Sequence, residues 1–275
     1  MVKGVDNVNN VKVGIQLYAL MPEFNAEPEE TLRKIKEMGY TGVEFPMFML
    51  KRSPREDFNT QPASYFKKLL EDAGLECYGI LASWVDVQPD VLDANIEYNK
   101  ELGSPFFVIG SVPRDLVPDI ESAKKAIEYM HEVQKKINAA GLVTGYHNHD
   151  SDFFNVIEGK TFFEHIFDNT PDDFVMLLDT GNAHAGGADS AELLKKYPHR
   201  SPYFHIKGYS QAEGYRAAVG KDDYDWNELC NLAINTGDAK ILNIEFSTKE
   251  GIDSVERAKW SSDFIGGIVN KMHNA

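Results

Sequence analysis

Three side chains of types that bind metal ions follow three consecutive apolar segments in the last part of the chain. Asp179 ends the segment VMLLD, His205 lies in YFHIK, and Glu245 ends ILNIE. An unpaired charge next to a buried segment is costly, and convergence on a divalent cation offsets that cost. One imidazole and two carboxylates form a mixed nitrogen and oxygen set suited to Mn²⁺, Mg²⁺, Co²⁺ or Zn²⁺. The three residues therefore predict a metal site that needs a fourth ligand from a neighbouring segment.

The stretch GYHNHDSDF, residues 145–153, contains two candidates for the fourth ligand. It continues an alternating apolar run, so in a β-strand His147 and His149 would point to the same face. They could be a metal ligand, a general base with its helper, or two histidines at the rim of a core. Asp179 and Glu245 have structural alternatives too, because an Asp after a strand often caps a helix and a Glu there often forms a salt bridge.

These side chains must be positioned by the elements that precede them, and the chain alternates strands with helices throughout. Short runs rich in β-branched and aromatic residues are typical of strands, and each is followed by a segment of helical period. Strands are expected at Lys12–Leu17, Gly42–Phe45, Glu76–Leu81, Phe106–Ile109, Leu142–His147, Phe174–Asp179, Tyr203–Lys207 and Ile241–Phe246. Helices are expected at Pro28–Met38, Ala63–Ala73, Val91–Leu102, Ile120–Ala140, Thr161–Asp168, Ala191–Lys196, Trp226–Asn235 and Val255–Met272.

Eight alternating units predict the α/β class and a single (β/α)8 TIM barrel with parallel strands. The 275 residues suit one such domain, which typically has about 250. We expect the barrel domain to cover residues 1–275, with residues 1–10 as a short N-terminal extension. Barrels of this kind carry their chemistry at the carboxyl ends of the strands, where all the candidate ligands stand.

Composition and charge exclude several classes of partner. The net charge of −15 and the pI of about 4.9 argue against nucleic acid, which is bound mainly through Lys and Arg. No apolar run approaches the roughly 18 residues of a membrane span, so we expect no membrane partner and a cytoplasmic location. Cys77 and Cys230 lie too far apart for a metal knuckle and are expected to be buried thiols.

Several phrases between Gly14 and about Phe264 resemble the sugar phosphate isomerase/epimerase family, also described as xylose-isomerase-like TIM barrels. They are GIQLYAL, GYTGVEF, YHNHDSDF, LDTGNAHAGGAD, FHIKGY, the VG…DW stretch at Val219 to Trp226, and NIEF. The resemblance implies one divalent metal ion at the barrel mouth, most often Mn²⁺. By position it implies the ligands His147, Asp179, His205 and Glu245. Many relatives carry Glu at the position of His147 and His at that of Asn182, so a pair of proton-shuttling glutamates is not implied.

A metal at this site would acidify a C–H bond beside a sugar carbonyl. Glu245 would take the proton to form an enediolate, and His147, His149 or Lys207 would return a proton. We therefore expect an isomerase or epimerase of a ketose, keto-sugar or oxidised glycoside. The alternatives are a metal-dependent dehydratase of a keto-polyol of the inosose type and a barrel that binds a sugar without catalysis. Barrels of this family often associate, so a homo-oligomer is compatible with the resemblance.

Further residues at the strand ends are candidates for substrate contact, each with a structural alternative. Lys207 follows His205 by two residues and could stabilise an oxyanion or pair with a carboxylate. Gln16 and Glu44 could hydrogen-bond sugar hydroxyls or be polar residues of the rim. Trp84 could offer a flat face to a sugar ring or pack against the protein. His149 and Asn182 complete the predicted set.

Overall fold

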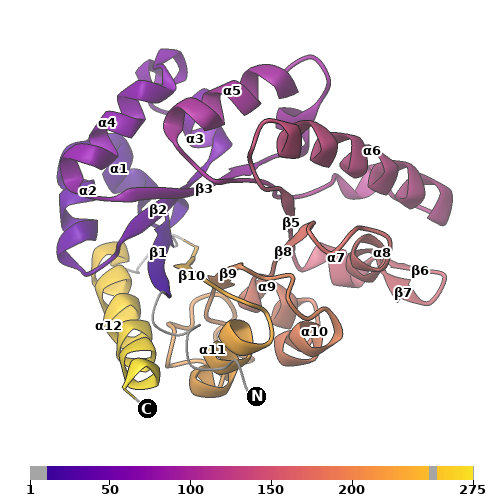
Figure 1. Cartoon of the computed structure of the whole chain (residues 1–275). Helices are drawn as coiled ribbons and strands as arrows, with labels where there is room; N and C mark the ends of the chain where they lie inside the picture. The colour runs from indigo at the N-terminus through magenta and orange to yellow at the C-terminus, as the bar shows by residue number, and fades with distance from the viewer. Residues whose placement is uncertain (1–10, 248–252, 275) are drawn as a thin grey trace.

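Eight parallel strands form the centre of the protein in the computed structural model, which describes residues 11–247 and 253–274 (Figure 1). They are β1 (Lys12–Gln16), β2 (Gly42–Pro46), β3 (Glu76–Ala82), β4 (Phe106–Ile109), β5 (Gly145–His147), β8 (Val175–Leu177), β9 (Tyr203–Ile206) and β10 (Ile241–Ile244). Around the barrel the order is β8-β5-β4-β3-β2-β1-β10-β9. A parallel bridge between Asp179 and His205 brings the two ends of this sheet together. The expected extension, residues 1–10, lies outside the described residues.

A helix of seven to twenty residues follows each strand and covers the outside of the barrel, so the predicted (β/α)8 fold is confirmed. In α4 the buried residues Ala63, Phe66, Leu69 and Leu70 form one face, and Gly74 ends the helix with a φ of 68°. Among the described residues we find no helix that combines the length and the apolar character of a membrane span. The helices are α2 (Pro28–Glu37), α4 (Ala63–Ala73), α5 (Leu92–Leu102), α6 (Ile120–Ala139), α8 (Phe162–Asp168), α10 (Ser190–Lys196), α11 (Trp226–Asn235) and α12 (Ser254–His273).

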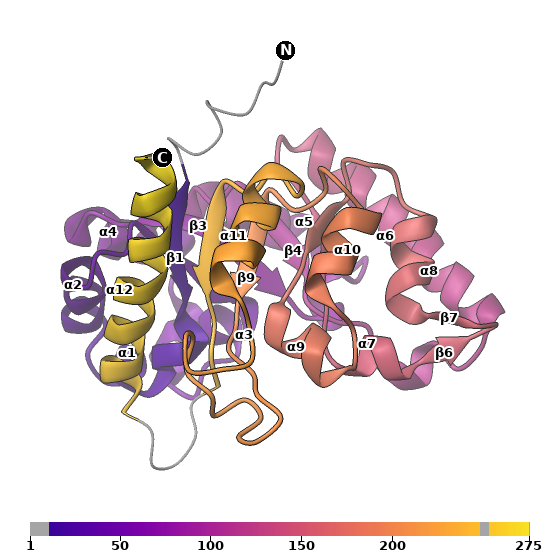
Figure 2. The same ribbon diagram turned by 90° about the horizontal axis from the view of Figure 1, so that it is seen from below.

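Short elements that the sequence did not predict follow several strands directly. Because they have only two to six residues, they contain too little of a helical or strand period to be recognised. Figure 2 shows them gathered at one end of the barrel, where the strands have their carboxyl ends. They are α1 (Met21–Ala26), α3 (Met47–Lys51), α7 (Ser151–Phe154), α9 (Thr180–Ala185) and the antiparallel pair β6 (Val156–Ile157) and β7 (Lys160–Thr161).

Large side chains fill the barrel interior near the amino ends of the strands, and glycines on neighbouring strands leave room for them. Tyr78 and Tyr203 are buried there together with Val108, Val175, Leu177 and Ile241. A Cβ at Gly14 or Gly42 would lie 2.6 or 2.5 Å from ring atoms of Tyr78, so only glycine fits at these two positions. The packed interior forms a floor, and the polar residues stand above it at the mouth.

Candidate active site

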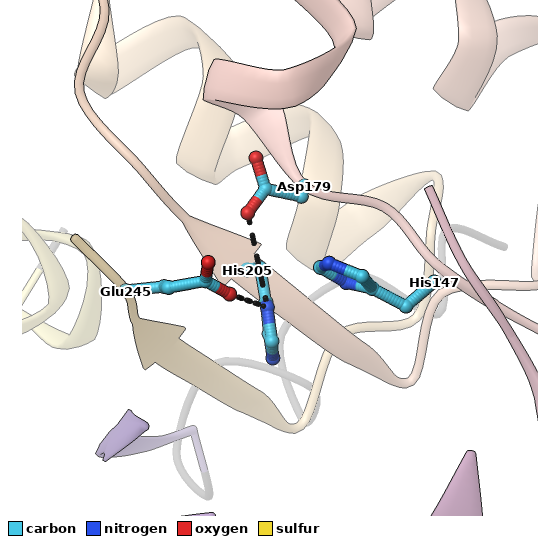
Figure 3. A group of neighbouring side chains, drawn as sticks. All are labelled: His147, Asp179, His205 and Glu245. Carbon is cyan, nitrogen blue, oxygen red and sulfur yellow. Dashed lines mark hydrogen bonds and ion pairs between the residues drawn. The ribbon is translucent and has the colours of Figure 1, made fainter. Parts of the chain in front are cut away.

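Four of the predicted residues meet at the carboxyl end of the barrel. His147 ends β5, Asp179 follows β8, His205 lies on β9, and Glu245 follows β10. Each has a ligand atom within 4.8 Å of one in every other member, and all four side chains are buried. Figure 3 shows the side chains facing one another from four consecutive strands of the barrel. The arrangement has the residue types and the spacing of a metal-binding cluster.

His205 lies at the centre of this cluster, between two carboxylates. Its Nδ1 is 2.9 Å from Glu245 Oε2 and 3.9 Å from Asp179 Oδ2, whereas its Nε2 is 3.2 Å from Glu44 Oε2. Burial alone would lower the pKa of His205, but Glu44 and Glu245 outweigh it and raise the pKa to about 10. A metal-binding histidine commonly has its second ring nitrogen hydrogen-bonded to a carboxylate. Glu44 is in the position to do this for His205.

Asp179 caps a helix and faces the cluster at the same time. Its Oδ1 accepts a hydrogen bond of 2.6 Å from the Asn182 N–H in the first turn of α9. Its Oδ2 is buried without a hydrogen-bond partner among the described residues, 3.9 Å from His205 Nδ1 and 3.7 Å from Lys207 Nζ. Burial raises the pKa of Asp179 to about 7, although Lys207 opposes the shift. The capping interpretation is therefore correct for one oxygen, and the other remains free to bind a ligand.

The charge of the cluster fits a divalent cation. Three buried carboxylates, those of Glu44, Asp179 and Glu245, surround His205, and one buried ammonium group, that of Lys207, pairs with Asp179 and Glu245. Once His205 gives up its proton, as a metal ligand must, this leaves two negative charges, which a divalent cation would cancel. Within the described part of the chain, Asp179 Oδ2 and His147 Nδ1 are buried without hydrogen-bond partners, which is rare for such atoms. These unpaired atoms and the negative charge of the cluster with His205 deprotonated indicate that the cluster could hold a metal ion.

Lys207 joins the cluster to the cavity above it. Its Nζ donates to Glu245 Oε1 at 2.7 Å and to Asn182 Oδ1 at 3.0 Å. Burial would lower the pKa of Lys207, but Asp179 and Glu245 outweigh it and raise the pKa above its usual value. In return, Lys207 and His205 hold the pKa of Glu245 well below its usual range, against the effect of burial. Lys207 thus pairs with a carboxylate and also lines the cavity, so both interpretations of this residue stay open.

Gln16 and Glu44 are neighbours in the sheet register but lie at different depths. Gln16 Nε2 donates to Glu44 Oε1 at 2.8 Å and to Glu245 Oε2 at 3.1 Å. Gln16 lines the cavity, whereas Glu44 is fully buried and is not among the residues that line it. Gln16 is therefore placed for substrate contact, and Glu44 is placed beneath it, against His205.

The two histidines of β5 and its loop are both neutral at neutral pH. Burial lowers the pKa of His147 well below its usual value, and the nearby His205 adds to the effect. Burial and the charge of Lys207 also lower the pKa of His149. Their rings are 5.1 Å apart, and both line the cavity as the predicted strand alternation requires. A neutral imidazole is the form that binds metal or accepts a proton.

A cavity of about 420 Å³ opens above the cluster at the barrel mouth. His147, His149, Asn182, Lys207 and Glu245 line its polar side. Its volume is within the usual range of small-molecule sites, about 300–1,000 Å³. The cavity therefore places these five predicted residues and Gln16 around one space for a ligand.

Trp84 lies outside this cavity. Its ring packs edge-on against Tyr129 at 5.5 Å, and it is not among the lining residues. Three aromatic residues that were not predicted as substrate contacts, Tyr18, Phe48 and Tyr215, line the cavity instead. The position of Tyr18 in the cavity could have been predicted, because it follows Gln16 by two residues just after the end of β1. Phe48 lies on the short helix α3, and no pattern in the sequence pointed to it.

Three further polar residues support the cluster and were also missed. Asn148 binds both backbone groups of Asp179, accepting from its N–H at 2.8 Å and donating to its carbonyl at 3.1 Å. Asp152 accepts hydrogen bonds from the His149 N–H at 2.8 Å and from the Tyr146 hydroxyl at 3.0 Å. Asn243 Nδ2 is 3.2 Å from His205 Nε2. Of the three, only Asn243 could have been predicted from the sequence, because it precedes Glu245 by two residues and so points to the same face of the strand.

Comparison with known proteins agrees with this architecture. Solved structures similar to the chain include a sugar phosphate isomerase/epimerase from Parabacteroides distasonis ATCC 8503, with 24% identity, a TM-score of 0.77 and coverage of 94% of this chain and 96% of that chain. The 3-keto-D-glucoside 4-epimerase YcjR from E. coli has 16% identity, a TM-score of 0.66 and coverage of 94% and 99%. The IOLI protein with a bound zinc atom has 14% identity, a TM-score of 0.70 and coverage of 95% and 99%. At these identities the likeness shows the fold.

No curated protein sequence matches the chain. The family model of the xylose isomerase-like TIM barrel, in contrast, matches residues 32–266. Because this match covers most of the 275 residues, the chain belongs to the xylose isomerase-like TIM-barrel family.

Proposed function

We propose that this protein is a divalent-metal-dependent isomerase or epimerase that acts on a ketose, keto-sugar or oxidised glycoside. The observation that carries the proposal is the cluster of His147, Asp179, His205 and Glu245 at the base of a cavity in the barrel mouth. Similar structures include a sugar phosphate isomerase/epimerase and a keto-glucoside epimerase, which supports a sugar as the substrate. We propose Mn²⁺ as the native ion, with Mg²⁺, Co²⁺ and Zn²⁺ as alternatives.

The four cluster residues would hold the ion, and when bound it would polarise a carbonyl group and acidify the adjacent C–H bond. Glu245 is our choice for the base that removes this proton. It lines the cavity and its low pKa keeps it ionised at neutral pH, as a base must be. Lys207, whose ammonium group lies 2.7 Å from Glu245 Oε1, would stabilise the negative oxygen of the enediolate.

Lys207 is our choice for the group that returns a proton, with His147 and His149 as alternatives, because its ammonium group carries a proton at neutral pH whereas both imidazoles are neutral. It lines the cavity from the end of β9, next to Glu245 at the end of β10. Return of a proton to the opposite face of the same carbon would invert its configuration, which is epimerisation. Return of the proton to the neighbouring carbon would give isomerisation. Gln16 and Asn182 would hold substrate hydroxyl groups.

Exchange of a substrate proton with solvent deuterium tests this proposal. With wild-type protein loaded with Mn²⁺, a ketose or 3-keto-glycoside is expected to incorporate deuterium at a carbon next to its carbonyl group. Glu245→Gln is expected to abolish this exchange. Binding of a sugar without exchange would reject the enzyme and favour a barrel that only binds sugar.

Dehydration of a keto-polyol is the second candidate, and the ammonium group of Lys207 supports it. A charged amine at the base of the cavity could protonate a departing hydroxyl group, which isomerisation does not need. Mass analysis of the product distinguishes the two reactions, because dehydration removes a water molecule and isomerisation leaves the mass unchanged.

A further inference from the structure

The cavity at the barrel mouth has two chemically different sides. The residues that could react or bind metal come from β5, β8, β9 and β10. The opposite side, at the ends of β1, β2 and β3, presents Tyr18, Pro46, Phe48 and Leu81 to the same cavity. We refer to these four residues as the apolar wall.

The protein covers the aromatic rings of the apolar wall only in part. Tyr18 and Phe48 are both half-buried, and their rings contact each other edge to face at 6.3 Å with an interplanar angle of 71°. Half-buried aromatic side chains that line a cavity leave apolar ring surface for a ligand. A small polar sugar held over Lys207 and Glu245 would leave this surface in contact with water.

Charge excludes a phosphate group from this side. Of the described residues, those that line the cavity from β1 to β3 carry no charge, since they comprise the apolar wall with Gln16, Ala82 and Ser83. The only Lys or Arg among the described lining residues is Lys207, on the opposite side, and it is already paired with Glu245. A phosphate dianion at the wall would therefore lose its hydration without gaining a cation.

We propose that the substrate is an uncharged keto-glycoside whose apolar, ring-bearing aglycone lies on the apolar wall while its oxidised sugar ring lies over Lys207 and Glu245. Tyr18 and Phe48 are then specificity-determining residues. The inference rests on the proposed function, because it places the reacting carbon over the metal-binding cluster. It narrows the substrate class from sugars in general to keto-glycosides with an aromatic or similarly flat aglycone, for which unoxidised glycosides serve as binding analogues.

Calorimetric binding of matched ligands to the Mn²⁺-loaded protein tests the inference. The probes are glucose, galactose and xylose, their methyl and phenyl glycosides in both anomeric forms, and glucose 6-phosphate. Contact of one phenyl ring with Tyr18 and Phe48 is expected to make the preferred phenyl glycoside bind about tenfold more tightly than its methyl counterpart. Glucose 6-phosphate is expected to bind no more tightly than glucose.

Variants of the wall provide the control for folding and for non-specific apolar binding. Phe48→Ala and Tyr18→Leu are each expected to bring the ratio of phenyl to methyl affinity close to one. Phe154→Ala removes an exposed ring from α7 that does not line the cavity, and it is expected to leave the ratio unchanged. A wild-type ratio near one, no binding by any phenyl glycoside, or tighter binding of the phosphate would overturn the inference.

Deuterium exchange into the corresponding keto-sugars separates this inference from the proposed function. Exchange without any preference for a phenyl aglycone would leave the isomerase or epimerase proposal in place and overturn the aglycone site. A preference for phenyl glycosides without exchange in any keto-sugar would support the aglycone site and overturn the proposed reaction.

Discussion

Replacing Glu44 with glutamine is expected to weaken divalent-metal binding although Glu44 is not itself one of the four ligands. Glu44 is fully buried, its Oε1 accepts a hydrogen bond from Gln16 Nε2 at 2.8 Å, and its Oε2 is 3.2 Å from His205 Nε2. Glutamine has nearly the same shape but only one acceptor oxygen. In either orientation its amide NH₂ would face a donor, on Gln16 or on His205. The histidine would lose the partner that holds its orientation, and the cluster would lose one negative charge.

Loss of such an outer partner typically lowers metal affinity by about 10- to 100-fold. This corresponds to about 1.4 to 2.8 kcal/mol of binding free energy. Calorimetric titration of Mn²⁺ into metal-free protein measures the effect. The matched control is Glu76→Gln, since Glu76 is also on a strand but pairs with Lys12 at the surface, and its Mn²⁺ affinity should equal that of the wild type. Equal Mn²⁺ affinities of Glu44→Gln and the wild type, at equal thermal stability, would refute the role assigned to Glu44.

Three other predictions concern the framework that carries the site. Gly145→Ala would place a Cβ against the backbone carbonyl of Val175 and should lower the free energy of unfolding by about 3 kcal/mol. Gly266→Ala, at an open position of α12, should raise the free energy of unfolding by about 0.5–1 kcal/mol. Urea denaturation measures both changes, and equal effects of the two substitutions would contradict the packing described for Gly145. Arg200→Met should lower the free energy of unfolding by about 3 kcal/mol or more, because the buried guanidinium donates to the carbonyls of Phe167, Pro171 and Phe174. A variant as stable as the wild type in the same urea experiment would show that those carbonyls find other donors. Burial raises the pKa of Cys77 and of Cys230 to about 12. Neither thiol should therefore react with a disulfide reagent at pH 8 until the protein unfolds. Fast reaction of either thiol in the native protein would show that it is not buried.

Strand alternation made most of the metal-binding cluster predictable from the sequence. His147 and His149, and likewise His205 and Lys207, are two residues apart, so each pair had to leave its strand on one face. In a parallel barrel all strand ends meet at one mouth, and this brings Asp179, His205 and Glu245 together from segments far apart in the chain. The fold class and the positions of the eight strands followed from the same periodicity.

The features of the site that the sequence did not predict depend on how deeply a side chain lies in the barrel and on very short helices. No residue pattern specifies either of these. Gln16 and Glu44 are register partners, yet only the packing of the interior shows that Glu44 lies beneath the cavity against His205. Phe48 reaches the cavity from a helix of five residues, too short to give a period. Trp84 has the right position in the sequence for substrate contact, but its ring packs on Tyr129 of α6.

The stoichiometry of metal binding tests the central claim most directly. Calorimetric titration of Mn²⁺ into folded, metal-free wild-type protein is predicted to show about one site per chain. His205→Ala and Asp179→Asn should abolish this binding, and Lys207→Met should retain it while losing deuterium exchange. A folded wild-type protein that contains no metal as purified and shows no heat of binding with Mn²⁺, Co²⁺, Mg²⁺ or Zn²⁺ would contradict the account.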